Sequence, residues 1–67
     1  MSHSNTLRFY LARAAQARVD AEAATLDHVR ERCRRSEAAW TALAERAERS
    51  EQLKAAEAIR KAAVPTA

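Results

Sequence analysis

The sequence predicts an all-α protein folded as an antiparallel helical hairpin, and three observations carry this prediction. Glycine is absent from the 67 residues and proline occurs once, at Pro65, so little in the chain interrupts a helix. Alanine and arginine, two strong helix formers, dominate the composition. The large apolar residues fall into two stripes with helical spacing, and the two stripes are out of phase with each other.

The first helix is predicted over residues 6–24. Ser4, Asn5 or Thr6 can cap its start by offering a side-chain oxygen to the free amides of the first turn. Its apolar stripe, spaced by three and four residues, consists of Leu7, Tyr10, Leu11, Ala14, Ala17, Ala21 and Ala24. Residues 1–5 are predicted to form a flexible end.

The second helix is predicted over residues 27–49, after a turn between Ala24 and Asp27. Continuing the first stripe would put His28 and Arg35 at apolar positions, so the chain must change direction before them. A new stripe with heptad spacing consists of Leu26, Val29, Cys33, Ser36, Trp40, Leu43 and Ala47. Thr25 can cap this helix, and Asp27 places a negative charge in its first turn, where the helix dipole favours one.

Beyond Ala47 the second stripe ends, and two interpretations of residues 50–63 stay open. Ser50 could cap a short third helix. A continuous extension of the second helix is favoured, because nothing before Pro65 breaks it. Residues 64–67 are predicted to form a second flexible end of this single-domain chain.

The hairpin predicted from these stripes has small residues near its turn and large ones at its open end. Ala17 and Ala21 would face Val29 and Cys33, which lets the two backbones approach closely. Toward the open end, Tyr10 and its neighbours would meet Trp40 and its neighbours. The expected core of the hairpin, or seam of a dimer, consists of Leu7, Tyr10, Leu11, Ala14, Leu26, Val29, Cys33, Trp40, Leu43 and Ala47.

The apolar side chains are few for a chain that must order some sixty residues. Burying one large apolar side chain contributes ~1.5–3 kcal/mol, whereas ordering one residue costs ~1.5 kcal/mol. Chains of this size commonly gain stability from disulfides, metals or self-association, and a single cysteine excludes an internal disulfide. We therefore expect a homodimer that forms a four-helix bundle. Phe9, opposite Leu7 on the helical wheel, is the candidate for a second interface, and binding to a different protein is the alternative.

The charge pattern leaves a nucleic-acid interpretation open as the second choice. The net charge is +3, with nine acidic residues interleaved among twelve basic ones, so the basic excess is small. Arg30 and Arg34 share one side of the predicted helix, while Arg35 can pair with Glu31. In a dimer, two copies of the segment from Arg30 to Arg35 could contact phosphates. The candidate contacts are Arg30, Arg34 and Arg35.

Catalytic, metal and cofactor sites are not expected. Cys33 would need a nearby base to act as a nucleophile, and His28 lies about 140° around the helix from it. His3, His28 and Cys33 do not share a face as metal ligands must. No apolar run has the ~18 residues of a membrane span, the start of the chain lacks the pattern of a signal peptide, and the single cysteine fits a reducing compartment. We predict a cytoplasmic, non-enzymatic protein without cofactors.

Two segments carry a resemblance to other proteins. Thr25-Leu26-Asp27-His28-Val29-Arg30-Glu31-Arg32 is the first and Ala39-Trp40-Thr41-Ala42-Leu43-Ala44 is the second. From Tyr10 to about Arg49 the chain resembles a group of short uncharacterised alphaproteobacterial proteins. The resemblance implies a compact bacterial helical hairpin and brings no known activity. The function expected from the sequence is that of a protein–protein interaction or regulatory adaptor.

Overall fold

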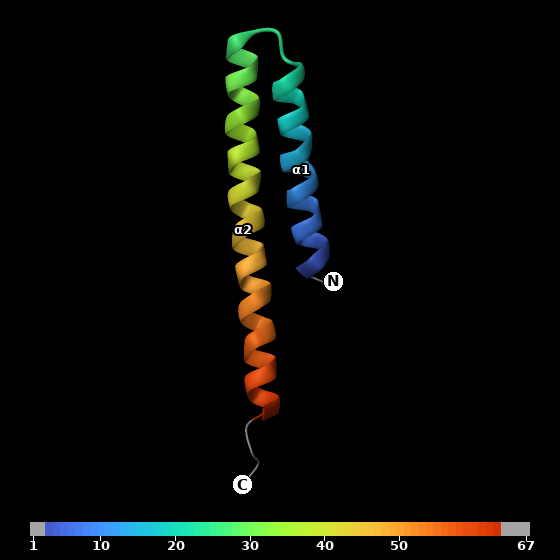
Figure 1. Cartoon of the computed structure of the whole chain (residues 1–67), viewed down its shortest axis with the longest axis vertical. Coiled ribbons are helices and arrows are strands. Elements are labelled where there is room, and N and C mark those ends of the chain that lie inside the picture. The colour runs from blue at the N-terminus through green and yellow to red at the C-terminus, as the bar shows by residue number, and fades with distance from the viewer. Residues whose placement is uncertain (1–2, 64–67) are drawn as a thin grey trace.

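Two helices make up the part of the chain that the computed structural model describes, residues 3–63. Helix α1 spans His3–Ala23 and helix α2 spans Asp27–Ala63, and residues 24–26 connect them. The helices run antiparallel, side by side, with the turn at one end (Figure 1). No strand occurs within the described residues. The predicted all-α helical hairpin is confirmed. The predicted flexible ends at residues 1, 2 and 64–67 lie outside the described residues.

The helix boundaries differ from the predicted ones mainly at the two ends of the chain. Helix α1 begins at His3, three residues before the predicted start, because neither glycine nor proline prevents the polar residues from Ser4 to Thr6 from joining it. The break before Asp27 is where the change of stripe predicts it. Helix α2 continues without interruption to Ala63, which excludes a separate third helix over residues 50–63.

Small side chains form the centre of the contact between the helices. The buried residues are Ala17, Ala21 and Ala44, and no large side chain of the described residues is fully buried. Alanine lets two helix backbones approach closely, but it removes little apolar surface from water. Around this centre, half-buried residues continue both predicted stripes: Leu7, Tyr10, Ala14, Ala24, Val29, Cys33, Ser36, Trp40, Leu43 and Ala47.

Two residues of the predicted core, Leu11 and Leu26, are exposed. The face of α1 that meets α2 is centred on the rows of Ala17 and Ala21, which places Leu11 on its flank. Leu26 lies in the turn, before the first residue of α2. The prediction is therefore wrong for both residues as core positions of the single hairpin, whereas their place in a dimer seam stays a prediction.

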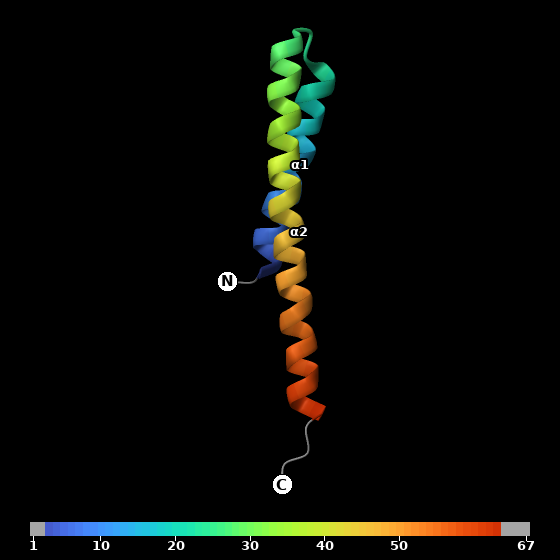
Figure 2. The same ribbon diagram turned by 90° about the vertical axis from the view of Figure 1, so that its left-hand side faces the viewer.

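Helix α2 extends well beyond the start of α1. At 1.5 Å per residue, its 37 residues measure about 55 Å, against about 31 Å for the 21 residues of α1. The excess projects at the open end of the hairpin, past the first turn of α1, and in the view turned by 90° it again stands alone (Figures 1 and 2). Residues 52–63, which we call the overhang, are all exposed, including Leu53 and Ile59.

Candidate interaction site

Three aromatic rings meet between the middle of the hairpin and its open end. The ring centroids of Phe9 and Trp40 are 5.8 Å apart in an edge-to-face arrangement, and those of Tyr10 and Trp40 are 5.9 Å apart. Phe9 and Tyr10 are separated by 6.0 Å. These separations lie in the favourable range for aromatic pairs, each of which contributes about 0.5–1.5 kcal/mol beyond the burial of apolar area. The predicted contact between Tyr10 and Trp40 is confirmed.

A cation completes this group. The guanidinium carbon of Arg13 lies 5.3 Å from the centroid of the Trp40 ring, within the distance at which a cation is attracted to the face of an indole. Arg13 follows Tyr10 by three residues, so both lie on the same side of α1. We call Phe9, Tyr10, Arg13 and Trp40 the aromatic cluster. Sequence reasoning missed Arg13, although its spacing from Tyr10 was a usable signal.

The aromatic cluster joins the helices and also stays open to solvent. Tyr10 and Trp40 are half-buried, whereas Phe9 remains 54% exposed and Arg13 is exposed. The helical wheel predicts Phe9 on the side of α1 that faces away from α2, but in the structure its ring contacts the ring of Trp40. Tryptophan, tyrosine and arginine are the residues most enriched at the energetic centres of protein interfaces. The cluster therefore has the composition of a binding surface.

Arg30 is the first arginine of the basic run, the segment from Arg30 to Arg35, and its side chain contacts the turn between the helices. Arg30 donates a hydrogen bond from Nη2 to the carbonyl oxygen of Ala24, at 3.0 Å, and its Nη1 lies 3.3 Å from Oδ1 of Asp27. The Ala24 carbonyl lies just after the end of α1, whose last turn contains no basic residue. A cation is favourable at that end of a helix. Arg30 thus supplies from α2 the charge that α1 lacks, and its guanidinium is occupied there.

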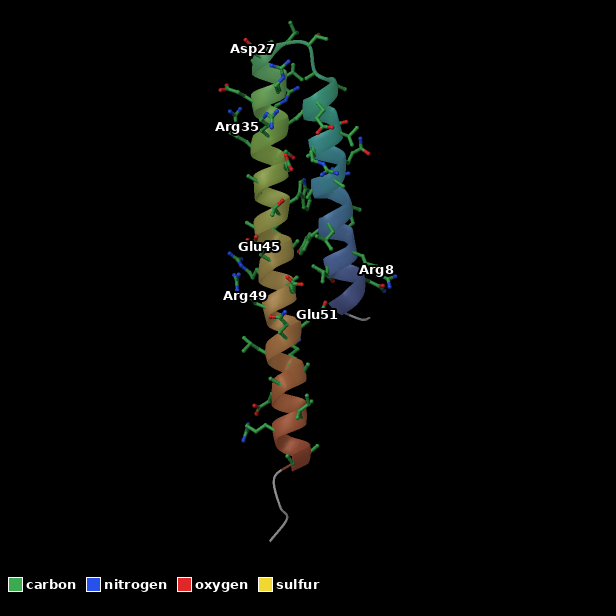
Figure 3. The ribbon with its side chains drawn as sticks, viewed as in Figure 1. Arg8, Asp27, Arg35, Glu45, Arg49 and Glu51 are labelled. Carbon is green, nitrogen blue, oxygen red and sulfur yellow. The ribbon has the colours of Figure 1, made fainter. Side chains whose placement is uncertain are left out.

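The other two arginines proposed for phosphate contact are exposed. Arg34 and Arg35 lie on α2, and Arg35 projects from the side of α2 that faces away from α1 (Figure 3). The structure therefore does not bring the three arginines together as one group. Arg30 is bound at the turn, while the other two project into solvent.

A carboxylate complements the opposite end of α1. Glu51 lies on the side of α2 that faces the start of α1 (Figure 3), and its Oε2 atom is buried without a hydrogen-bond partner. The first turn of α1 contains no acidic residue. Because the start of a helix carries a partial positive charge, Glu51 offers α1 a favourable negative charge. Glu37, another half-buried acid of α2, lines a shallow depression of about 210 Å³ with Ala14, Ala15 and Arg18.

The remaining reactive side chains do not converge on a site. Cys33 is a half-buried free thiol within the stripe of α2, and His28 is exposed. Among residues 3–63, no three His, Cys, Asp or Glu side chains gather in a group that could hold a metal ion. Neither α1 nor α2 is both long and apolar enough to cross a membrane.

Comparison of the chain with models of protein families, with curated proteins and with solved structures finds no match.

Proposed function

We propose that this chain is a small cytoplasmic protein–protein interaction or regulatory adaptor that works as a dimer of helical hairpins. Binding, rather than catalysis, is the activity that its architecture supports. The observation that carries this proposal is the large surface that the single hairpin leaves in contact with solvent.

The accessible surface of the chain is 5487 Å². A compact folded protein of 7.5 kDa would expose only about 4,200 Å², from the scaling of surface with mass. The excess is roughly 1,200 Å², and a standard protein interface removes about 800 Å² from each partner. Association with a second hairpin through a standard interface would therefore remove about two thirds of this excess.

The weak core supports the same proposal. Only alanines are buried among the described residues, and the large residues of both stripes are half-buried or exposed. Two hairpins that pack face to face in a four-helix bundle would cover the sides of these stripes. The stability of such a chain depends on its own concentration, because dimerisation draws the folding equilibrium toward the native state.

Sedimentation velocity over a range of micromolar concentrations tests the proposal. We expect a dimer whose dissociation is accompanied by loss of helical circular dichroism or by a lower melting temperature. A monomer that stays fully folded across that range would refute the dimer.

Nucleic-acid binding through Arg34 and Arg35 is the competing interpretation, and a titration separates the two. Binding to phosphates weakens steeply as salt is added, because it releases counterions. Dimerisation through an apolar surface has no such dependence. If the chain binds an oligonucleotide at low salt and its affinity falls steeply toward moderate salt, the nucleic-acid interpretation is favoured over the adaptor.

A further inference from the structure

We infer that the aromatic cluster is the surface on which a second copy of this chain docks. The inference rests on the proposed dimer and deepens it, because it assigns one side of the hairpin to the interface. On α1, the alternative positions for an interface are the flank that carries Leu11, which the sequence places in the dimer seam, and the outer side that carries Val19.

The geometry of α1 separates these three sides. Consecutive residues of an α-helix are about 100° apart, so Phe9 and Leu11 flank Tyr10 on opposite sides. Val19, nine residues after Tyr10, lies about 180° from it. Tyr10 itself contacts Trp40 on α2. Phe9 therefore marks one open side of the hairpin, Leu11 marks the other, and Val19 faces outward.

The side marked by Phe9 has the strongest composition for an interface. Phe9 and Arg13 both contact the Trp40 ring there, and three rings and a guanidinium form one continuous surface. Tyr10 and Trp40 are already half-buried within the hairpin, so the area of the cluster that a partner can still cover lies mainly on Phe9 and Arg13, together with what remains exposed of the other two rings. The cluster can thus form the centre of an interface in which one partner buries roughly 800 Å², with neighbouring residues on the same side supplying the rest.

A second copy fits this surface because the hairpin itself lacks buried area. The surface excess of the chain, roughly 1,200 Å², is larger than the area of about 800 Å² that one partner of a standard interface buries. In a two-fold dimer the same patch is used twice, so a single aromatic cluster on each copy provides both halves of the contact. A second copy therefore accounts for the larger part of the missing burial.

Three serine substitutions with matched exposure test this assignment by sedimentation. Phe9, Leu11 and Val19 are 54%, 53% and 51% exposed, respectively, and all three lie on α1. We expect Phe9→Ser to raise the dimer Kd about thirtyfold or more, the size of a hot-spot loss. Leu11→Ser and Val19→Ser should leave the Kd within a few-fold of the native value. Circular dichroism at high protein concentration reports whether each variant keeps its helices.

Trp40, the single tryptophan, provides a second readout that needs no substitution. Its fluorescence should shift to shorter wavelength as the native chain is concentrated, because the partner covers the indole. This measurement stays informative even if Phe9→Ser fails to fold.

The outcomes distinguish this inference from the proposed function. A native monomer at all concentrations would overturn both. A dimer that Leu11→Ser or Val19→Ser disrupts and Phe9→Ser does not would overturn the assigned surface alone, as would an unchanged Trp40 emission on dimerisation. If the chain is a monomer and its Trp40 emission shifts when oligo-dT is added, the aromatic cluster binds nucleic-acid bases instead of a second copy. That result would also overturn the inference.

Discussion

Replacing Arg30 with alanine should destabilise the hairpin, whereas the same substitution at Arg34 should not. Both arginines lie in one basic run of α2, but only Arg30 reaches the Ala24 carbonyl, at 3.0 Å, and Asp27, at 3.3 Å. Arg34 is exposed. The pair of variants therefore separates the contribution of the turn from the general effect of removing an arginine from a helix.

The size of the effect follows from the exposure of the groups. A hydrogen bond to a charged group contributes about 1.5–3 kcal/mol when it is buried. The Arg30 side chain is 41% exposed and that of Asp27 is 96% exposed, so solvent screens these contacts and the ion pair adds little. We expect a loss of about 1 kcal/mol for Arg30→Ala, which lowers the melting temperature of a chain of this size by about 4–8 °C.

Thermal unfolding followed by circular dichroism measures this difference. Both variants and the native chain are compared at one protein concentration, because dimerisation makes the melting temperature depend on concentration. The change in intrinsic helix propensity is the same for the two substitutions and cancels in the comparison. Equal melting temperatures for Arg30→Ala and Arg34→Ala would show that the Arg30 contacts do not hold the turn, and the reasoning would be refuted.

Three further predictions concern the helix contact, the start of α1 and the end of α2. Ala21 is fully buried, so Ala21→Leu should cost about 1–3 kcal/mol through overpacking, while Ala12→Leu on the exposed side of α1 should be nearly neutral in denaturant unfolding. Glu51→Gln should lower the free energy of unfolding by about 0.3–1 kcal/mol through the loss of a negative charge beside α1, and an unchanged value would remove that role. The hydrogen bond from Arg60 lowers the pKa of Glu57 below its ordinary value of 4.5. The pair therefore stabilises the folded chain above pH 4.5. This stabilisation is lost as the pH falls through the lowered pKa of Glu57. An NMR titration should show a Glu57 midpoint below 4.5 that rises in Arg60→Ala, and identical midpoints in the two proteins would contradict the interaction.

The helices and the position of the turn were predictable because they follow from local properties of the chain. The lack of glycine, the high helix propensity and the phase change before Asp27 act within a few turns of helix. The stripe of α2 from Val29 to Ala47 was also predictable, since its half-burial follows from heptad spacing alone. The contact between Tyr10 and Trp40 then followed from matching the two stripes in antiparallel order.

The sequence could not predict which side chains lie at the centre of the helix contact, because this depends on how each helix is rotated about its own axis. A helical wheel of α1 places Leu11 within the apolar stripe that packs on α2. In the structure the contact face of α1 lies closer to Ala17 and Ala21. The same rotation buries Ala44 on α2, four residues after Trp40, a position that the stripe analysis left out. The reach of Arg30 to Ala24 depends on the shape of a three-residue turn, which no periodicity describes.

The two pairs Glu57–Lys61 and Glu57–Arg60 illustrate a smaller ambiguity. The preferred orientation of charges at positions i and i+4 favours Lys61 as the partner of Glu57. The structure pairs Glu57 with Arg60 instead, with Nε of Arg60 2.9 Å from Oε2. A guanidinium can bind both carboxylate oxygens at once, and here its Nη2 also contacts Oε1. The planar geometry of arginine outweighs the more favourable spacing of lysine.

The free energy of local unfolding differs along the molecule, and it is lowest in the overhang. Twelve residues are too few to hold a helix in water by themselves, since the first turn is costly to start. Residues 52–63 avoid that cost because they continue a helix already formed against α1. Amide hydrogens should therefore exchange fastest near Ala63 and more slowly between Glu51 and the turn, where α2 packs against α1. A protease should remove the overhang as far as about Glu51 and leave the paired helices intact.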